Sequence, residues 1–253
     1  MVRNLSKDLG LKIVIISRGR YDVITTTKLL PKEIEVVVPV SEEQKYREKI
    51  ENPLVLIPDD QIGLGMVRNW CLDNFSEETL IMVDDDLDCL YDLTGEKTRR
   101  IEDSEEIMQV LINTAVMAKD SGAKFFCFSQ TDIRKYNATE PFYLSRWIGG
   151  VVGVIGRQLR FRDDKFKVDI DFTLKNLLVN RIVWQDARYT FVQKRNGNKG
   201  GNSIFRTERE YKESVKSLQE TWGRFINVSG GETRSDINIT LNVQRKQNKI
   251  YLD

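Results

Sequence analysis

The first 90 residues alternate short apolar, β-branched runs with stretches that can form helices. Strands are expected at 11–17, 34–38, 54–57 and 80–83, with helical segments between them at 21–30, 42–51 and 63–75. Parallel strands need a crossover connection, which is usually a helix. The alternation therefore predicts an α/β fold with a parallel sheet and helices on both faces. In such sheets ligands bind beyond the carboxyl ends of the strands.

The second half of the chain has a less regular pattern. Helices are expected at 104–121, with Ser104 as a plausible cap, and at 168–180 and 208–226. Strands are expected at 124–128, 147–156, 182–192 and 237–243, and the glycine-rich stretch 195–203 is expected to be a flexible loop. No repeat or clear linker interrupts the sequence, so a single domain over residues 1–253 is the simplest division, with a variable C-terminal part.

The chain contains no histidine among its 253 residues. This absence removes the commonest general base and transition-metal ligand, and the usual partner of a nucleophilic serine or cysteine. Catalysis would have to use carboxylates, which with Mg²⁺ or Mn²⁺ suit phosphate-containing substrates. The net charge is only +1, so a polyanionic partner would need a local basic patch.

Composition also bears on where the chain works. The cysteines Cys71, Cys89 and Cys127 are widely separated, which favours reduced, buried thiols over a redox or metal motif. No apolar run approaches the roughly 20 residues that a membrane span needs, and residues 1–10 do not resemble a signal peptide. We expect a cytosolic protein.

Three consecutive aspartates, Asp84, Asp85 and Asp86, follow the strand expected at 80–83. Clustered carboxylates repel one another unless a cation neutralises them. This favours a metal site in which Asp84 and Asp86 face one ligand and Asp85 faces another, because alternate side chains of an extended chain point the same way. The alternative is an acidic solvated loop or a helix cap.

Two further groups are candidates for binding a nucleotide or its phosphates. Arginine supplies fixed, bidentate donors to phosphate, and helix-end amides attract anions. The first group follows the first strand and the second lies just inside the helix after Gly63 and Gly65. They consist of Ser17, Arg18 and Arg20, and of Arg68 and Asn69. An exposed basic turn is the alternative for the first group.

A second acidic pair, Asp169 and Asp171, stands at the start of the helix expected at 168–180. Aspartate at such a place commonly caps the helix. The other member of the pair could act as a general base. Both interpretations stay open on the residues alone.

Basic residues concentrate in two regions with aromatic residues between them. A groove lined in this way could hold nucleic acid through phosphates and base stacking, although a solvated face is the simpler interpretation of either region alone. The candidate acceptor or DNA contacts are Arg160, Arg162, Lys194, Arg195 and Lys199.

The order of these motifs resembles that of nucleotide-sugar-dependent glycosyltransferases of the GT-A fold. The likeness runs over about residues 11–205. The matching motifs are Ser17-Arg18-Gly19-Arg20, Gly63-x-Gly65-x-x-Arg68-Asn69, Val83-Asp84-Asp85-Asp86, Gly149-Gly150 and Asp169-x-Asp171-Phe172-x-Leu174.

The resemblance implies a role for each acidic residue and a bound metal. Asp84 would lie near the ribose of the donor and Asp86 on Mn²⁺ or Mg²⁺, with a UDP-sugar as the expected donor. Asp169 would be the general base and Asp171 its support or a helix cap. Many members of the superfamily add a late histidine to the metal shell; here that role is empty or passes to a residue such as Asn198 or Asn202.

Within that superfamily, the Ser-Arg-Gly-Arg turn and the Val-Val-Val-Pro run followed by Glu42 and Tyr46 resemble bacteriophage TET-associated glycosyltransferases. This resemblance implies transfer of a sugar to 5-hydroxymethylcytosine in DNA, in the host cytoplasm. Residues 1–103 would then bind the nucleotide sugar and residues 104–253 the acceptor. The alternatives are a sugar nucleotidyltransferase on a similar fold and a non-catalytic DNA-binding or scaffold module.

Overall fold

A computed structural model describes residues 8–129, 140–146, 150–163, 167–193, 207–230 and 237–243. Its strands are β1 (Leu11–Ile16), β2 (Glu35–Pro39), β3 (Leu54–Ile57), β4 (Thr79–Asp84), β5 (Leu87–Asp92), β6 (Arg99–Ile101), β7 (Phe125–Ser129), β8 (Phe142–Tyr143), β9 (Val151–Ile155), β10 (Trp184–Gln193), β11 (Ile226–Ser229) and β12 (Asn238–Leu241). Its helices are α2 (Glu43–Arg47), α3 (Leu64–Asn74), α4 (Ser104–Asp120), α5 (Val168–Val179) and α6 (Glu208–Trp222), with the 3-10 turns η1 (Thr26–Lys28), η2 (Val40–Glu42) and η5 (Gly223–Phe225).

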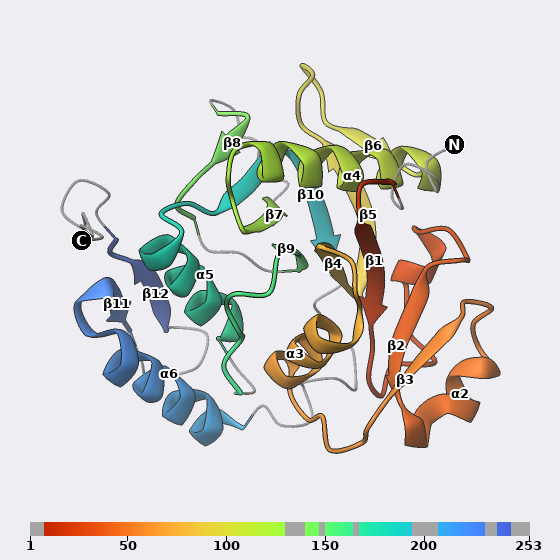
Figure 1. The fold of residues 1–253 in the computed structure, drawn as a ribbon, viewed down its shortest axis with the longest axis horizontal. Helices are drawn as coiled ribbons and strands as arrows, with labels where there is room; N and C mark the ends of the chain where they lie inside the picture. The colour runs from red at the N-terminus through yellow and green to blue at the C-terminus, as the bar shows by residue number, and fades with distance from the viewer. Residues whose placement is uncertain are drawn as a thin grey trace.

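The large central sheet joins both halves of the chain (Figure 1). Its strand order is β3-β2-β1-β4-β9-β7-β10-β5-β6, with β8 paired to β10. Strands β1, β2, β3, β4, β7, β10 and β6 run in one direction, and β9, β5 and β8 run in the other. The predicted α/β fold with a mostly parallel central sheet flanked by helices is therefore confirmed.

Apolar side chains on the two faces of the sheet bury against different helices. On one face, Ile13 and Ile15 of β1 pack in a cluster with Leu111 and Ala115 of α4. On the other face, Val14 belongs to a cluster that includes residues of α3 and α5. Alternate residues of a strand point to opposite faces, so a continuous apolar run such as β1 is buried on both sides.

Strand β9 enters the sheet between β4 and β7 and runs antiparallel to both. A β-carbon at Gly153 would lie 2.0 Å from Cζ of Phe126 on β7. The strand therefore needs glycine at this position, because a neighbouring aromatic ring occupies the space of a side chain.

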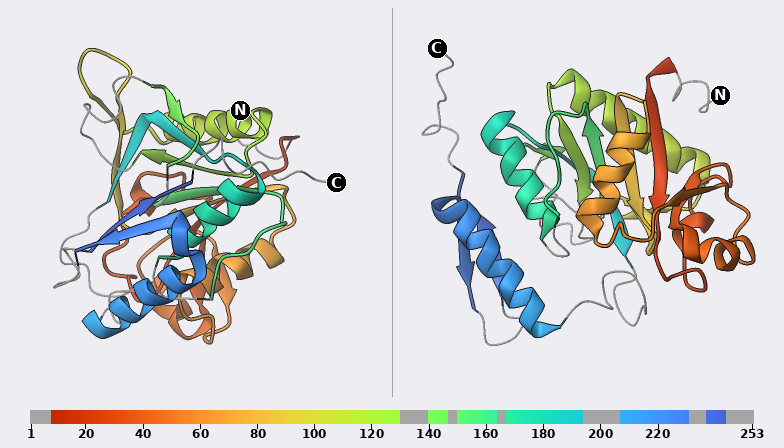
Figure 2. Two further views of the ribbon diagram at one scale, coloured as in Figure 1. Left: turned by 90° about the vertical axis from the view of Figure 1, so that its left-hand side faces the viewer. Right: turned by 60° about the horizontal axis from the view of Figure 1, so that its bottom comes forward.

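Helix α6 and the hairpin β11–β12 lie beyond α5, on the side of the molecule away from β2 and β3 (Figure 2). Ile170 and Leu174 of α5 share an apolar cluster with Leu218 of α6 and Ile239 of β12. Helix α5 thus packs against the sheet with one side and against this C-terminal layer with another.

Most predicted elements are found in the predicted order, but the helix expected at 42–51 extends only over Glu43–Arg47, and 21–30 is not a helix. Only the 3-10 turn η1 forms there. The hydroxyl of Thr26 donates to the carbonyl of Asp84 at 2.6 Å and accepts from the amide of Leu87 at 3.0 Å. β-Branched, hydroxylated residues are weak helix formers, and here one of them fixes the turn after β4 instead.

Other details of the predicted elements were also wrong. The cap of α4 is Asp103, whose side chain accepts from the amide of Glu106, and not Ser104. Helix α6 ends at Trp222, and Ile226 begins strand β11. Strands β5 and β6 were not predicted from the sequence. The expected loop 195–203 lies outside the described residues.

Among the helices described, none combines the length and the apolar character needed to cross a lipid bilayer.

Candidate functional site

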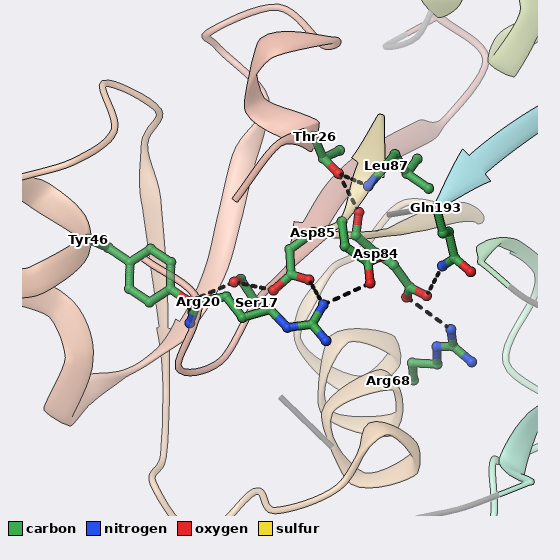
Figure 3. A network of polar contacts seen from close by, with 10 residues as sticks. Ser17, Arg20, Thr26, Tyr46, Arg68, Asp84, Asp85, Leu87 and Gln193 are labelled. Atoms are coloured by element: carbon green, nitrogen blue, oxygen red, sulfur yellow. Dashed lines mark hydrogen bonds and ion pairs between the residues drawn. The ribbon is translucent and has the colours of Figure 1, made fainter. Parts of the chain in front are cut away.

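The turn after β1 and the aspartates after β4 lie together because these two strands are neighbours in the sheet. Ile16 pairs with Asp84 in parallel register, so both chains leave the sheet at the same edge. This is the carboxyl edge, where ligands of such sheets bind. The structure thus brings Ser17 and Arg20 to the three aspartates (Figure 3).

Asp85 is held by a buried chain of hydroxyl groups and by an arginine. Ser17 Oγ donates to Asp85 Oδ2 at 2.5 Å, and Tyr46 OH lies 2.6 Å from Ser17 Oγ. Arg20 Nη1 donates to Asp85 Oδ1 at 2.6 Å. Burial raises the pKa of Asp85 to about 6, while Arg20 and Ser17 oppose the rise. Both carboxylate oxygens of Asp85 have protein partners.

Asp86 shares the same arginine but keeps one oxygen without a partner. Arg20 Nη1 donates to Asp86 Oδ2 at 2.9 Å, whereas Asp86 Oδ1 is buried and accepts no hydrogen bond. Mg²⁺ commonly binds proteins through one or two carboxylates and completes its shell with substrate phosphates and water. The residues therefore fit a divalent cation that a diphosphate helps to hold. The described residues contain no group of three or more carboxylate, cysteine or histidine side chains that could hold a metal by themselves.

Asp84 faces away from Arg20 and lies between two other donors. Gln193 Nε2 donates to Asp84 Oδ2 at 2.9 Å, and Arg68 Nη2 lies 3.5 Å from Asp84 Oδ1 (Figure 3). Burial raises the pKa of Asp84 to about 7; Asp86 and Asp85 add to the rise, and Arg68 opposes it. The side chain of Asp84 is 24% exposed, so a ligand can still reach its carboxyl group.

The predicted alternation of the three aspartates was wrong. It required an extended chain, but β4 ends at Asp84 and residues 85 and 86 form a turn. The amides of Thr25 and Thr26 bond the carbonyl of Asp85 and hold that turn. Asp85 and Asp86 therefore share the guanidinium of Arg20, and Asp84 contacts a separate set of donors.

Arg68 is buried beneath the site with incomplete hydrogen bonding. Its side chain is 1% exposed, and Nε and Nη1 have no hydrogen-bond partner. The guanidinium lies 5.4 Å from the centre of the Phe161 ring. Burial lowers its pKa, while Asp84 and Asp169 oppose the change. Arg68 therefore places a buried positive charge near both Asp84 of β4 and Asp169 of α5.

Asn69, its neighbour on α3, serves the packing of the chain. Asn69 Nδ2 donates to the carbonyl of Phe161 at 2.9 Å and to Asp163 Oδ1 at 3.3 Å, and Asn69 Oδ1 accepts from the amide of Phe161 at 2.9 Å. The structure does not bring this amide to the three aspartates.

Arg18 and Gly19 stabilise the loops at the same sheet edge. Arg18 Nη2 donates to the carbonyls of Asp59 and Gln61 at 3.2 and 3.1 Å. The amide of Gly19 donates to Glu42 Oε2 at 2.6 Å. These contacts join the turn after β1 to the segments that follow β2 and β3.

Asp169 and Asp171 lie in the first turn of α5 but have different surroundings. Asp169 is partly exposed; burial raises its pKa, and Lys167 and Arg68 oppose the rise. Asp171 is 2% exposed, accepts from Trp222 Nε1 at 3.0 Å and pairs with Lys175 at 2.7 Å. The bond to Trp222 means that Asp171 joins α5 to α6. Residues two apart on a helix do not share a face, so Asp169 does not lie beside Asp171.

Neither aspartate caps the helix, which corrects one of the two sequence interpretations. The residue before α5 is Lys167, with a φ of 56° and no side-chain cap bond. A left-handed residue therefore occupies the N-cap position of α5, and Asp169 and Asp171 both lie inside the first turn.

The candidate acceptor residues lie at different places. Arg162 Nη2 donates to Ser217 of α6 at 2.8 Å. Arg160 Nη2 pairs with Asp73 at the C-terminal end of α3, whereas Arg68 lies in the first half of that helix. The carbonyl of Arg160 accepts from Lys175 of α5, which pairs with Asp171. Lys194, Arg195 and Lys199 lie outside the described residues, as do Asn198 and Asn202.

Gln193 and Thr26 belong to the site but were missed in the sequence. Gln193 is 109 positions from Asp84. The pairing of β10 with β5 shifts register between Val192 and Gln193. Such a bulge redirects a side chain, and no local sequence pattern announces it. Gly150, with a φ of 83°, lies against Gln193; its would-be β-carbon is 3.5 Å from Nε2.

The model of the TET-Associated Glycosyltransferase family matches residues 11–201, which include every aspartate of the site. The chain belongs to this family. No curated protein matches it. The TET-associated glycosyltransferase resemblance inferred from the motifs is thereby confirmed.

Solved glycosyltransferase structures share the fold of this TET-associated glycosyltransferase at low sequence identity. The mannosyltransferase PcManGT from Pyrobaculum calidifontis, in complex with GDP-Man and Mn²⁺, is 14% identical, with a TM-score of 0.51 over 81% of this chain and 64% of its own. Glucosyl-3-phosphoglycerate synthase from Mycobacterium tuberculosis, in complex with Mn²⁺, UDP and phosphoglyceric acid, is 11% identical, with a TM-score of 0.50 over 95% of this chain and 89% of its own.

S. aureus TarS 1-349 is 14% identical over 72% of this chain, with a TM-score of 0.44. This chain spans 60% of the length of that structure.

Proposed function

We propose that the protein transfers a sugar from a nucleotide-sugar donor, with a UDP-sugar as first choice, to the hydroxymethyl group of 5-hydroxymethylcytosine in DNA. The observation that carries the proposal is the arrangement around Arg68. Asp84 at the end of β4 contacts this buried guanidinium. The charge of the guanidinium also acts on Asp169 at the start of α5. Family membership supports glycosyl transfer. The family's description supports a hydroxymethylated base as acceptor.

The donor would bind across the carboxyl edge of β1 and β4. Asp84, whose side chain is partly exposed, suits the hydroxyl groups of a ribose, and Arg20 suits a diphosphate. Asp86 would hold Mn²⁺ or Mg²⁺ through its unpartnered oxygen. A bound cation would neutralise the charge of the leaving diphosphate.

Asp169 suits the general base of this reaction. Its pKa is raised by burial, and a base works best when its pKa lies near the operating pH. In the proposed reaction the acceptor oxygen bonds to the anomeric carbon, and the bond from that carbon to the diphosphate oxygen breaks. The hydroxyl proton passes to Asp169, and the nucleoside diphosphate leaves. A single displacement of this kind inverts the anomeric configuration.

The test is nucleoside mass spectrometry of duplex DNA after incubation with the protein, Mn²⁺ and a panel of nucleotide sugars. One duplex carries 5-hydroxymethylcytosine and its matched control carries cytosine. The expected result is one hexose or pentose on the modified nucleoside only, with release of nucleoside diphosphate.

Other outcomes point to other functions. Hydrolysis of a nucleotide sugar with unchanged DNA would remove the DNA acceptor and keep the donor. Release of pyrophosphate would favour a sugar nucleotidyltransferase. DNA binding with no nucleotide binding would favour a non-catalytic module.

A further inference from the structure

Arg20 makes the same kind of contact with the aspartates that a divalent cation would make. One nitrogen, Nη1, donates to Asp85 Oδ1 at 2.6 Å and to Asp86 Oδ2 at 2.9 Å. The side chains of Arg20, Asp85 and Asp86 are 15%, 7% and 14% exposed, so water screens these contacts only in part. The guanidinium therefore neutralises two adjacent carboxylates that would otherwise repel each other.

The two carboxylates differ in how firmly they are held. Asp85 has a second partner in Ser17, which Tyr46 supports, and its carbonyl is bonded by two amides of the η1 region. Asp86 has Arg20 on one oxygen and no hydrogen bond on the other. The Arg20 contact with Asp86 can therefore be exchanged without disturbing the turn, whereas the contact with Asp85 is part of a fixed network.

A second buried arginine at the same cluster has N–H groups that no protein acceptor satisfies. Arg68 is 1% exposed, and two of its nitrogens have no hydrogen-bond partner although Nη2 is directed at Asp84. A buried guanidinium with unpartnered N–H groups suits an additional anion. Arg20 and Arg68 lie on opposite sides of the aspartates, as their separate partners show (Figure 3).

We propose that Arg20 is an internal counter-ion that competes with the divalent cation for Asp86 and moves onto the donor diphosphate when the cation binds. This inference rests on the proposed function for the identity of the donor. The competition itself needs no sugar transfer. Arg20 keeps its contact with Asp85 throughout and acts as a positioning residue for both the cation and the diphosphate.

The test measures binding of Mn²⁺ alone, from the loss of the free-ion signal in electron paramagnetic resonance, for the wild type, Arg20→Gln, Arg20→Lys and Asp86→Asn. Arg20→Gln should bind Mn²⁺ roughly fivefold more tightly, the factor expected from loss of one partly exposed competing ion pair. The Mn²⁺ affinity of Arg20→Lys should lie between those of the wild type and Arg20→Gln, because lysine keeps the positive charge but lacks the planar, forked set of donors of arginine. Asp86→Asn should lose Mn²⁺ binding.

The second measurement is UDP binding by calorimetry at a Mn²⁺ concentration that saturates each protein. Arg20→Gln should bind UDP roughly fivefold more weakly, because the diphosphate loses a cationic partner. The two effects have opposite signs. A residue that only supports the fold would weaken both.

The matched control is Arg99→Gln. Arg99 also bridges two carboxylates, those of Asp92 and Glu106, but it lies on the surface with 54% of its side chain exposed. It should leave Mn²⁺ and UDP binding unchanged. If Arg20→Gln does not fold, Arg20→Lys alone still carries the test through its intermediate Mn²⁺ affinity.

Unchanged or weaker Mn²⁺ binding by Arg20→Gln would overturn the competition, and so would an absence of Mn²⁺ binding in every variant. Unchanged UDP binding would overturn the move onto the diphosphate. If Arg20→Gln gains Mn²⁺ affinity but the wild type transfers no sugar to any tested DNA, the counter-ion role stands and the proposed function fails.

Discussion

Trp222 Nε1 donates a hydrogen bond to Asp171 Oδ1 at 3.0 Å and thereby joins α6 to α5. Lys175 pairs with the other oxygen of the same carboxylate at 2.7 Å. Because Asp171 is 2% exposed, with a hydrogen bond on one oxygen and an ion pair on the other, we infer that it fixes the C-terminal layer and does not react. Asp169, two residues earlier, is partly exposed and is the residue that we propose as the general base.

Trp222→Phe should destabilise the protein by about 1.5–3 kcal/mol, the usual contribution of a hydrogen bond to a charged group. Urea unfolding measures the loss. UDP affinity should not change, because the residues proposed to bind the donor come from the ends of β1 and β4. A severe loss of turnover in Asp171→Asn at unchanged stability would contradict this role and make Asp171 catalytic.

Asp86→Asn and Asp169→Asn should separate donor binding from chemistry. Both should lose turnover, and loss of a general base typically costs about 10²–10⁴-fold. Asp86→Asn should also weaken UDP binding in the presence of Mn²⁺, because it removes the oxygen that is free to bind the cation. Asp169→Asn should bind UDP nearly as the wild type does. Calorimetry with UDP and Mn²⁺ measures the UDP affinity of both variants. Equal losses of UDP affinity would refute this division of roles.

The parts of this site that the sequence predicts are those set by local pattern. Ser17, Arg20 and the aspartates each follow an apolar β-branched strand, and two parallel strands in contact bring their ends together. The roles within the cluster were harder to predict. The alternation rule fails at Asp85 because the chain leaves the extended conformation there.

Contacts between distant segments could not be predicted from the sequence alone. The Gln193 contact depends on a bulge in β10 and on the position of that strand in the sheet. The insertion of β9 between β4 and β7 is a tertiary arrangement that periodicity does not encode. The different surroundings of Asp169 and Asp171 follow from a helix start at the left-handed residue Lys167, which is also unmarked in the sequence.

The metal-free protein should lose stability as the pH rises from about 4 to about 7. Asp84 has a pKa of about 7 in the folded protein, against about 3.9 for an unperturbed aspartate. Between these values the folded state holds a proton that the unfolded state has released, so raising the pH favours unfolding. Asp85, with a pKa of about 6, contributes with the same sign over the lower part of this range.

Asp84→Asn isolates the contribution of Asp84, because Asp85 is present in both proteins. The variant should show a flatter stability profile and should gain stability relative to the wild type as the pH rises toward 8. Thermal unfolding at several pH values in chelating buffer measures the difference. Parallel profiles for the two proteins would mean that Asp84 is ionised across the whole range.

Gly65→Ala should disturb the site from beneath, through the helix that carries Arg68. A β-carbon at Gly65 would lie 2.0 Å from the carbonyl oxygen of Arg162 and 3.3 Å from Val168. Since the nearest contact is backbone, α3 or the segment around Arg162 must move, and overpacking of this kind costs about 1–3 kcal/mol.

The matched control for this substitution is Gly95→Ala in the turn between β5 and β6, where the nearest atom to a β-carbon is 3.4 Å away. Its stability in urea should stay within about 0.5 kcal/mol of the wild type. Gly65→Ala should in addition weaken UDP binding, because a shift of α3 moves Arg68 away from Asp84. A loss of stability with unchanged UDP affinity would mean instead that the segment around Arg162 moves and α3 does not. Arg68 would then keep its contact with Asp84.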